Sequence, residues 1–179
     1  MKTFALFFSL LLPASTVLAG EDFFAQQPAT PGQQAPMQQP EPDVTEYQDW
    51  LHVCVDQQGQ DICFIQQTLA EDDPQQPPLL TARVFEQDPN WLQLILPLGV
   101  SLPDGMLFAV DEANEQLHPY QVCGVEGCLV EIELDGNLLE QLRGGREANV
   151  LFRGFGQDDT FGLDLSLMGF TAATEALGL

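Results

Sequence analysis

The chain has 179 residues and carries 5 lysine and arginine residues against 27 aspartate and glutamate residues, a formal net charge of -22. This length suits a single domain, and a hydrophobic content of 45% is enough to form a packed core. Nucleic acids and anionic lipid surfaces are recognised through basic patches, so the charge excludes a nucleic-acid-binding protein and a protein that binds such lipids.

The first 19 residues have the pattern of a secretory signal peptide. Lys2 provides the positive start, an apolar run covers residues 4–12, and Val17 and Ala19 suit a cleavage site directly after Ala19. The apolar run is too short to span a bilayer, so we expect cleavage after Ala19 and a mature chain without a membrane span. The expected location is the periplasm, with attachment to the outer membrane or display at the cell surface as further options.

Removal of residues 1–19 takes away Lys2, which is the only lysine of the chain. Four arginines then remain against all 27 acidic residues, so four minus 27 gives a net charge of -23. Added salt screens the self-repulsion of such a chain. The composition therefore predicts a protein adapted to a saline environment, whose melting temperature rises as salt is added.

Residues 20–45 form a segment rich in proline and glutamine, with five Pro and six Gln. A segment of this composition buries too little apolar surface to offset the conformational entropy that is lost on folding. We therefore expect a disordered, partly extended linker that tethers a folded domain at residues 46–179.

The domain at 46–179 has the alternation that is typical of β-strands. Between 128 and 134 every second residue is apolar, and the residues between them include Glu131 and Glu133. Further strands are expected at 48–55, 61–68, 80–86, 91–96, 106–110, 148–153 and 161–167. Seven to nine short strands separated by turns, without strand–helix alternation, predict an all-β sandwich of two sheets.

One or two short helices are expected within this domain. Asn137 is predicted to be an N-cap, because Glu140 follows it at the position that completes a capping box. Gly144 is predicted to end this helix. A second helix is expected at 171–177.

Four cysteines in an exported chain predict two disulfides, for which three connectivities are possible. A tight hairpin with its tip at residues 58–59 would place Cys54 opposite Cys63, and directly opposed strand residues are close enough for a disulfide. Cys123 and Cys128 close a short loop that contains two glycines. The spacing therefore favours the local pairs Cys54–Cys63 and Cys123–Cys128, each contributing about 2–3 kcal/mol of stability.

Two other uses of these cysteines fit their spacing less well. A zinc site would combine His52 and Cys54 with further ligands, but neither cysteine pair has the C-x2-C spacing that zinc sites favour. A redox site would need C-x-x-C and a basic neighbour to lower the pKa of a thiol.

The expected mature chain offers few candidates for catalysis. Its two serines, Ser101 and Ser166, lie outside a G-x-S-x-G motif, and its two histidines are His52 and His118. The acidic residues are too numerous for one catalytic pair to be singled out. We expect a protein that is not an enzyme, without catalytic residues, metal site or cofactor. Weak calcium binding is kept as an alternative at the acidic runs 71–73, 111–112 and 158–159.

Four stretches of the sequence resemble the invasion-associated locus B (IalB) family. They are the segment from Asp49 to Cys54 followed by Cys63, the Leu-Pro-Leu-Gly-Val-Ser-Leu-Pro-Asp-Gly stretch at 96–105, the Pro-Tyr-Gln-Val-Cys and Gly-Cys of 119–128, and the Gly-Phe-Thr-Ala-Ala at 169–173. Their order and spacing are similar to the family from about residue 47 to 177. Gln48 departs from the pattern, since many members have glycine there, and the linker has no counterpart.

The resemblance implies an exported bacterial protein with an immunoglobulin-like β-sandwich and a role linked to entry into host cells. It supplies no catalytic residues. Two functions follow as hypotheses. The first is a non-enzymatic protein of the cell envelope that binds an envelope or host protein, with a role in host-cell invasion. The second is a periplasmic protein that binds a small ligand or a cation.

Overall fold

The structure is a computed structural model that describes residues 41–73 and 75–179. The expected signal peptide at 1–19, and the expected linker up to residue 40, lie outside the described residues. Strand β1 (Asp43–Tyr47) begins inside the range predicted as linker, because it pairs with β2 (Trp50–Gln57) in an antiparallel hairpin. The folded domain therefore starts three residues before the predicted boundary at residue 46.

Within the described residues, seven strands form a larger sheet in the order β1-β2-β3-β4-β5-β9-β8, and all neighbouring strands are antiparallel. Besides β1 and β2 they are β3 (Gln60–Leu69), β4 (Leu80–Phe85), β5 (Trp91–Leu96), β8 (Val122–Gly124) and β9 (Gly127–Glu133). A smaller sheet in the same part of the chain has four antiparallel strands in the order β11-β10-β6-β7. These are β6 (Met106–Val110), β7 (Ala113–His118), β10 (Glu147–Arg153) and β11 (Thr160–Ser166).

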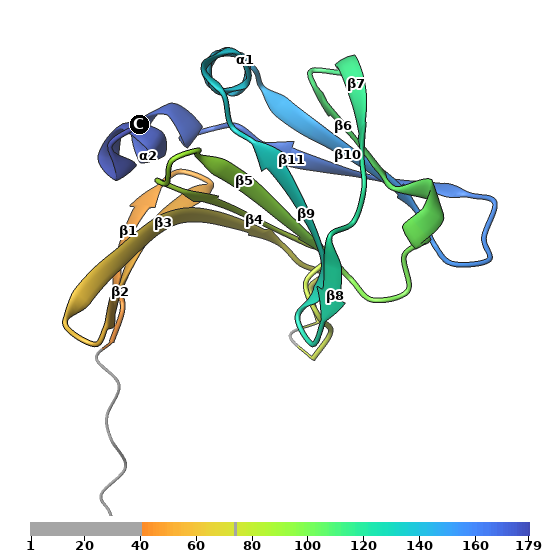
Figure 1. The fold of residues 1–179 in the computed structure, drawn as a ribbon, viewed down its shortest axis with the longest axis horizontal. Helices are drawn as coiled ribbons and strands as arrows, with labels where there is room; N and C mark the ends of the chain where they lie inside the picture. Colours follow the sequence, from red (N-terminus) through yellow and green to blue (C-terminus); the bar gives the residue numbers. More distant parts are fainter. Residues whose placement is uncertain (1–40, 74) are drawn as a thin grey trace, which may run out of the picture. The chain divides into compact units, whose positions relative to one another are not determined.

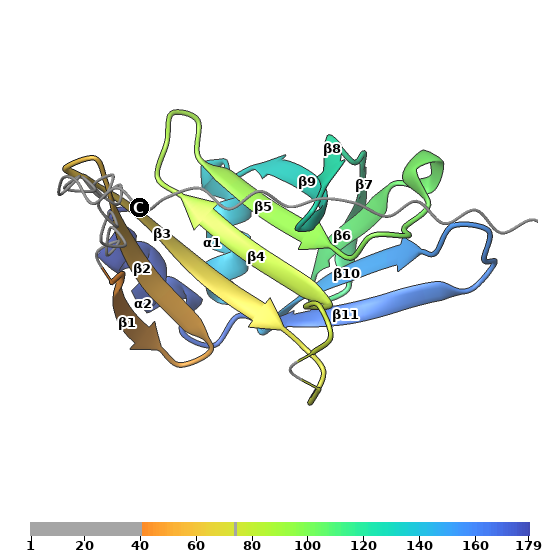
Figure 2. The ribbon, with the colours of Figure 1, turned by 90° about the horizontal axis from the view of Figure 1, so that it is seen from below.

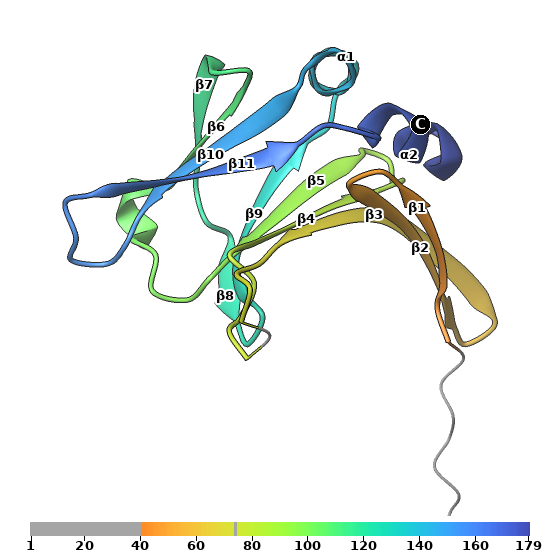
Figure 3. The same ribbon diagram turned by 180° about the vertical axis from the view of Figure 1, so that it is seen from behind.

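The two sheets face each other as the layers of a sandwich, as Figure 1 shows. Helix α2 (Phe170–Leu177) packs against β1, β2 and β3, on the side of the larger sheet that faces the smaller sheet (Figure 3). Helix α1 (Gly136–Gly144) connects β9 to β10 and lies beside α2 (Figure 2). The predicted all-β, two-sheet sandwich with two short helices is confirmed, and it is immunoglobulin-like in this layering.

The core between the layers follows the alternation of the sequence. On β9, Cys128, Val130 and Ile132 are at most 6% exposed, while Glu131 and Glu133 lie on the opposite face. Apolar residues at every second position therefore turn one face of each central strand inward, and burial of that face drives the packing of the sheets.

A buried glutamine reinforces the junction between β11 and α2. The side-chain amide of Gln67, on β3, donates to the carbonyl oxygens of Asp49 at 3.0 Å and Ser166 at 3.1 Å, and its own oxygen accepts from the Ser166 N–H at 3.0 Å. Trp50 Nε1 donates to the same Ser166 carbonyl at 2.9 Å. The Trp50 ring also meets Phe170 of α2 edge-on, with 5.0 Å between the ring centroids. These contacts hold the end of β11 against the larger sheet.

Both predicted local disulfides are present. Cys54 and Cys63 lie directly opposite each other on β2 and β3, in the register that the sequence predicts. Gly59, at the tip of this hairpin, has a φ of 86°, which favours glycine. Cys123 and Cys128 join β8 to β9 in the same way.

The predicted start of α1 requires a correction. Asp135, and not Asn137, is its N-cap: the Asp135 backbone is extended, and its carboxylate accepts a hydrogen bond from Leu138 N at 2.7 Å. Asn137 consequently lies in the first turn of the helix. Neither this helix nor any other in 41–73 and 75–179 is long and apolar enough to cross a membrane.

Candidate functional site

His52 and Cys54, which were weighed as zinc ligands, lie together with Cys63. The candidate ligand atoms of His52, Cys54 and Cys63 are all within 4.8 Å of one another, and no other group of three such residues was found in the described part of the chain. The two sulfur atoms, however, are bonded to each other, so neither is the thiolate that a metal ion requires. This cluster is a disulfide with a histidine beside it.

Both serines occupy structural positions. The Ser166 hydroxyl donates to the Asp49 carboxylate at 2.5 Å and accepts from Met168 N at 3.2 Å, which ties the end of β11 to the β1–β2 turn. Ser101 is 9% exposed and precedes the short 3-10 helix η1 (Leu102–Asp104). Within the described residues, neither serine hydrogen-bonds to a histidine.

Two of the acidic runs stabilise turns. The Asp111 carboxylate accepts hydrogen bonds from the backbone N–H groups of Arg146 at 3.0 Å and Glu147 at 3.1 Å, and these bonds lower the pKa of Asp111 below its ordinary value of 3.8. The Asp73 carboxylate accepts from Gln75 N at 3.0 Å. The Asp73 bond therefore holds its own turn, whereas the Asp111 bonds fasten the β6–β7 turn to the start of β10.

Three exposed apolar side chains gather at one end of the domain. Leu98, Leu102 and Phe155 are 62%, 52% and 80% exposed, and we call these three residues the apolar tip. The loop after β5 and the loop after β10 lie side by side there, because Phe155 N donates to the Gly99 carbonyl at 2.7 Å. Figures 1 and 2 both show these loops at the end of the domain opposite the β2–β3 hairpin.

Acidic residues belong to the same two loops as the apolar tip. Asp104 closes η1, and Asp158 and Asp159 follow in the loop between β10 and β11; all three are exposed. An apolar centre with a charged rim has the anatomy of a protein–protein interface.

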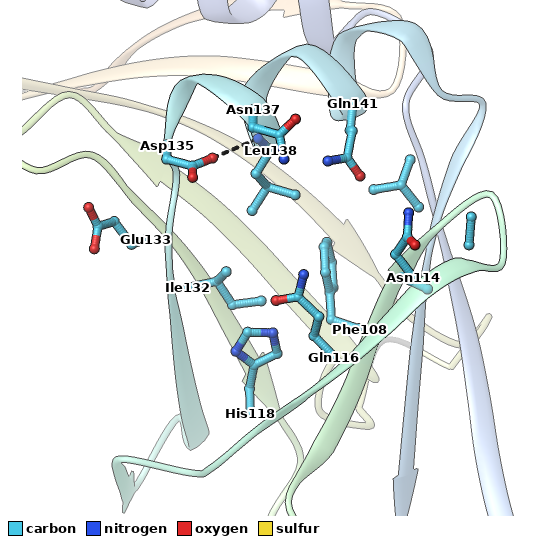
Figure 4. Close-up of a pocket in the computed structure, with 13 residues that line it drawn as sticks. Phe108, Asn114, Gln116, His118, Ile132, Glu133, Asp135, Asn137, Leu138 and Gln141 are labelled. Carbon is cyan, nitrogen blue, oxygen red and sulfur yellow. Dashed lines mark hydrogen bonds between the residues drawn. The ribbon is translucent and has the colours of Figure 1, made fainter.

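A cavity of about 110 Å³ opens between the smaller sheet, β9 and α1 (Figure 4). Asn114 and Gln116 line it from β7. Asn137 and Gln141 line it from α1, four residues apart and thus on one face of the helix. No hydrogen bond marked among the residues of Figure 4 involves these four carboxamides.

A histidine and three apolar side chains complete the cavity. Phe108, Ile132 and Leu138 supply apolar surface, and the His118 ring meets Phe108 edge-on at 6.4 Å between centroids. His118 Nε2 is buried and has no hydrogen-bond partner among the described residues. Burial also lowers the pKa of His118 below its ordinary value of 6.5, so the imidazole is neutral at pH 7.

Sequence reasoning missed both the apolar tip and the cavity. The cavity joins residues of β7 and α1, and no spacing motif marks side chains that only the tertiary fold brings together. The tip belongs to two loops that are more than 50 residues apart, of which the first lies in the stretch at 96–105 that carried the family resemblance.

The fold and the two local disulfides define a two-sheet β-sandwich. In it, helix α2 lies next to the smaller sheet and packs against the larger one. The chain belongs to the invasion-associated locus B family: the model described as Invasion associated locus B (IalB) protein matches residues 50–178. Among solved structures, the crystal structure of invasion associated protein B from Bartonella henselae is similar to it, with a TM-score of 0.64 and 24% identity over 75% of this chain and 93% of that chain. This likeness shows a common fold. No curated protein matches this chain.

Proposed function

We propose that this protein is exported and acts in the cell envelope by binding another protein, without catalysing a reaction. Membership of the IalB family supports this proposal, as does the signal-peptide pattern of residues 1–19. The disulfides Cys54–Cys63 and Cys123–Cys128 support export as well, because such bonds persist in oxidising compartments outside the cytoplasm.

The apolar tip is the observation that carries the proposed binding function. Leu98, Leu102 and Phe155 expose apolar surface to water, and burial of that surface against a partner is favourable. A large aromatic such as Phe155 is the kind of side chain that anchors an interface by filling a pocket on the partner. The acidic rim favours a partner whose pocket is surrounded by basic residues, since opposite charges steer and orient the complex.

The location of the partner decides which biological role follows. A partner inside the envelope would make the protein a component of an envelope assembly. A role in host-cell invasion, which the family name suggests, requires that the apolar tip be exposed at the cell surface.

Photo-cross-linking in intact cells tests the binding proposal. A photo-reactive phenylalanine analogue is placed at Phe155, and as a matched control at Gln60, an exposed residue of the β2–β3 hairpin at the other end of the domain. We expect one discrete cross-linked protein from position 155, which disappears when Leu98→Asp places a charge in the apolar tip. The proposal fails if position 155 gives no adduct, or if Gln60 gives the same one.

A further inference from the structure

We propose that the chain pairs with a second copy of itself along strand β11, so that the smaller sheets of the two copies join into one. Within the described residues, β11 is an edge strand, because β10 is the one strand that pairs with it. Figure 2 shows β11 along the margin of the domain. The contact uses residues outside the apolar tip, so this proposal stands or falls apart from the one above.

The hydrogen bonds at the end of β11 show which of its backbone groups point away from β10. Leu167 N donates to the Arg146 carbonyl at 3.0 Å, on the β10 side. Both backbone groups of Ser166 are instead bonded to the side chain of Gln67 on β3. In an antiparallel ladder, alternate residues direct their N–H and C=O groups to opposite sides. Every second residue before Ser166 therefore presents these groups at the open edge, namely Thr160, Gly162 and Asp164.

The other three edge strands of the described residues are less suited to pairing. Strand β8 has three residues, and the pairing of β7 with β6 contains a register shift. Strand β1 has five residues, of which Asp43 and Glu46 are acidic. Strand β11 has seven residues and a single acid, Asp164. Short, charged or irregular edges resist the addition of another strand, so β11 is the edge that is open to it.

One register joins two copies of β11 without placing like charges opposite each other. With the two-fold axis at Gly162, each Gly162 faces its equivalent, and Thr160 faces Asp164 of the second copy. The outward N–H and C=O groups of these residues then bond in pairs. On the face towards the larger sheet, Phe161 lies opposite Leu163 of the second copy. Phe161 is 44% exposed in the single chain, so this pairing removes apolar surface from water.

Charge complementarity favours a second copy of the chain as the partner. Arg153 is exposed and takes part in neither of the two ion pairs found among the described residues. It lies opposite Thr160, on the same face of the sheet as Asn149, whose side chain donates to the Asp164 carboxylate at 3.0 Å. In the joined sheet, Arg153 of each copy reaches past Thr160 to Asp164 of the other, across two strand spacings of about 4.8 Å. The two-fold axis forms this ion pair twice.

The charge of the whole chain makes the association dependent on salt. Two copies with a net charge of -22 repel each other. In the proposed register, Asp158 of one copy also lies opposite Ser166 of the other, which is hydrogen-bonded to Asp49. Raising the salt from about 10 mM to about 1 M shortens the range of this repulsion from about 30 Å to about 3 Å. We therefore expect the dimer at high salt.

Sedimentation velocity of the full chain, with its disulfides intact, tests the proposal. We expect a monomer in about 10 mM sodium chloride, and a dimer in about 1 M as the protein concentration rises to about 1 mM. Hydrogen exchange followed by nuclear magnetic resonance locates the contact on the unmodified chain. The amides of Gly162 and Asp164 should exchange more slowly in the dimer than in the monomer.

Two results of these measurements overturn the proposal. A chain that stays monomeric at about 1 mM in about 1 M salt leaves the β11 edge to a strand of another protein. A dimer in which the amides of Gly162 and Asp164 exchange as fast as in the monomer is joined through a different surface.

Exchange of the two charges tests the register. Arg153→Asp and Asp164→Arg each turn both proposed ion pairs into like-charge pairs and should weaken dimerisation about tenfold. The double variant restores the pairs with reversed charges, so its dimerisation should return to within about threefold of the native value. A double variant as weak as the single variants overturns the proposal.

A matched control separates the ion pair from net charge. Gln57→Glu combined with Gln60→Glu changes the net charge by the same amount as Arg153→Asp, at two exposed residues of the β2–β3 hairpin. It should weaken dimerisation less than Arg153→Asp does. Equal weakening by both would show that Arg153 acts through the overall charge, which contradicts the proposed pairing. Hydrogen exchange on the unmodified chain decides the matter even if a variant is unstable.

Discussion

At the scale of single residues, Gln67 shows how one buried polar side chain holds separate elements together. It makes three hydrogen bonds to the backbone of Asp49 and Ser166 while only 5% exposed. Gln67→Leu keeps a similar volume but removes the bonds to the Asp49 carbonyl and from the Ser166 N–H, while the Ser166 carbonyl keeps its bond from Trp50. We expect a loss of about 2–3 kcal/mol in the free energy of unfolding, measured by urea denaturation.

Gln60→Leu provides the control for this exchange, because Gln60 is exposed at the β2–β3 hairpin. It should change the free energy of unfolding by less than about 0.5 kcal/mol. Equal effects of the two substitutions would show that the Gln67 hydrogen bonds do not stabilise the junction.

A second residue-scale prediction concerns His118, whose pKa burial lowers below 6.5. Well above pH 6.5 the imidazole is neutral in both the folded and the unfolded chain, so the His118 ring takes nothing from the free energy of unfolding through proton binding. As the pH falls from 6.5 to the folded-state pKa, the unfolded chain binds the proton first, and stability is lost. We expect the difference in unfolding free energy between the native chain and His118→Leu to decrease across this window.

The titration of the His118 ring protons by nuclear magnetic resonance checks the same point directly. The expected midpoint lies below 6.5. A midpoint at or above 6.5 would mean that the ring is not buried as described.

At the scale of elements, the approach of α2 to the larger sheet depends on a glycine. Gly169 precedes α2 with a φ of 88°, and a Cβ atom there would lie 1.9 Å from the carbonyl oxygen of Tyr47. Gly59 has a similar φ of 86°, but a Cβ atom there would meet nothing within 4 Å. The two positions share the backbone conformation and differ in crowding.

Substituting alanine at Gly59 and at Gly169 separates the cost of the backbone conformation from the cost of crowding. Gly59→Ala should cost about 1–2 kcal/mol from the left-handed backbone alone. Gly169→Ala should cost about 3–5 kcal/mol, because Tyr47 and α2 must also move apart. Thermal unfolding of the two variants measures the difference; equal losses would show that α2 does not need this close approach.

The elements also show what can be predicted from a sequence. Strand β9 was predictable because buried residues alternate with more exposed ones along it, and the β2–β3 register followed from the position of the turn between Cys54 and Cys63. Strands β1, β7 and β8 were missed. Their residues are almost all exposed, so no alternating pattern marks them.

The cavity was unpredictable for the same reason. Gln116 sits on β7, a strand with no hydrophobic signal, and faces α1, whose start was placed two residues late. Asp135 competes successfully with Asn137 for the N-cap because its carboxylate reaches the N–H of Leu138 from an extended backbone. Such local competition between two capping residues that are two positions apart depends on where β9 ends, which the sequence pattern does not specify.

At the scale of the whole molecule, charge is the dominant property. Only Glu21 and Asp22 of the 27 acidic residues precede residue 41, so 25 share the described domain with four arginines. Two ion pairs occur between side chains of the described residues, Arg83–Glu126 at 3.7 Å and Arg143–Glu140 at 3.4 Å. Most carboxylates therefore have no cationic side chain beside them.

Salt should accordingly stabilise this protein. Raising the ionic strength from about 10 mM to about 1 M shortens the screening length from about 30 Å to about 3 Å. We expect the melting temperature to rise over this range, with sodium chloride and potassium chloride acting alike. A melting temperature that stays constant or falls would show that self-repulsion does not limit the stability.

Export to the envelope is the step on which the proposed binding function depends, and the intact mass of the native protein from fractionated cells tests it most directly. The predicted result is a chain of residues 20–179 in the envelope fraction, lighter by four hydrogen atoms because both disulfides are formed. A chain that begins at Met1 and carries four free thiols in the cytoplasmic fraction would contradict it.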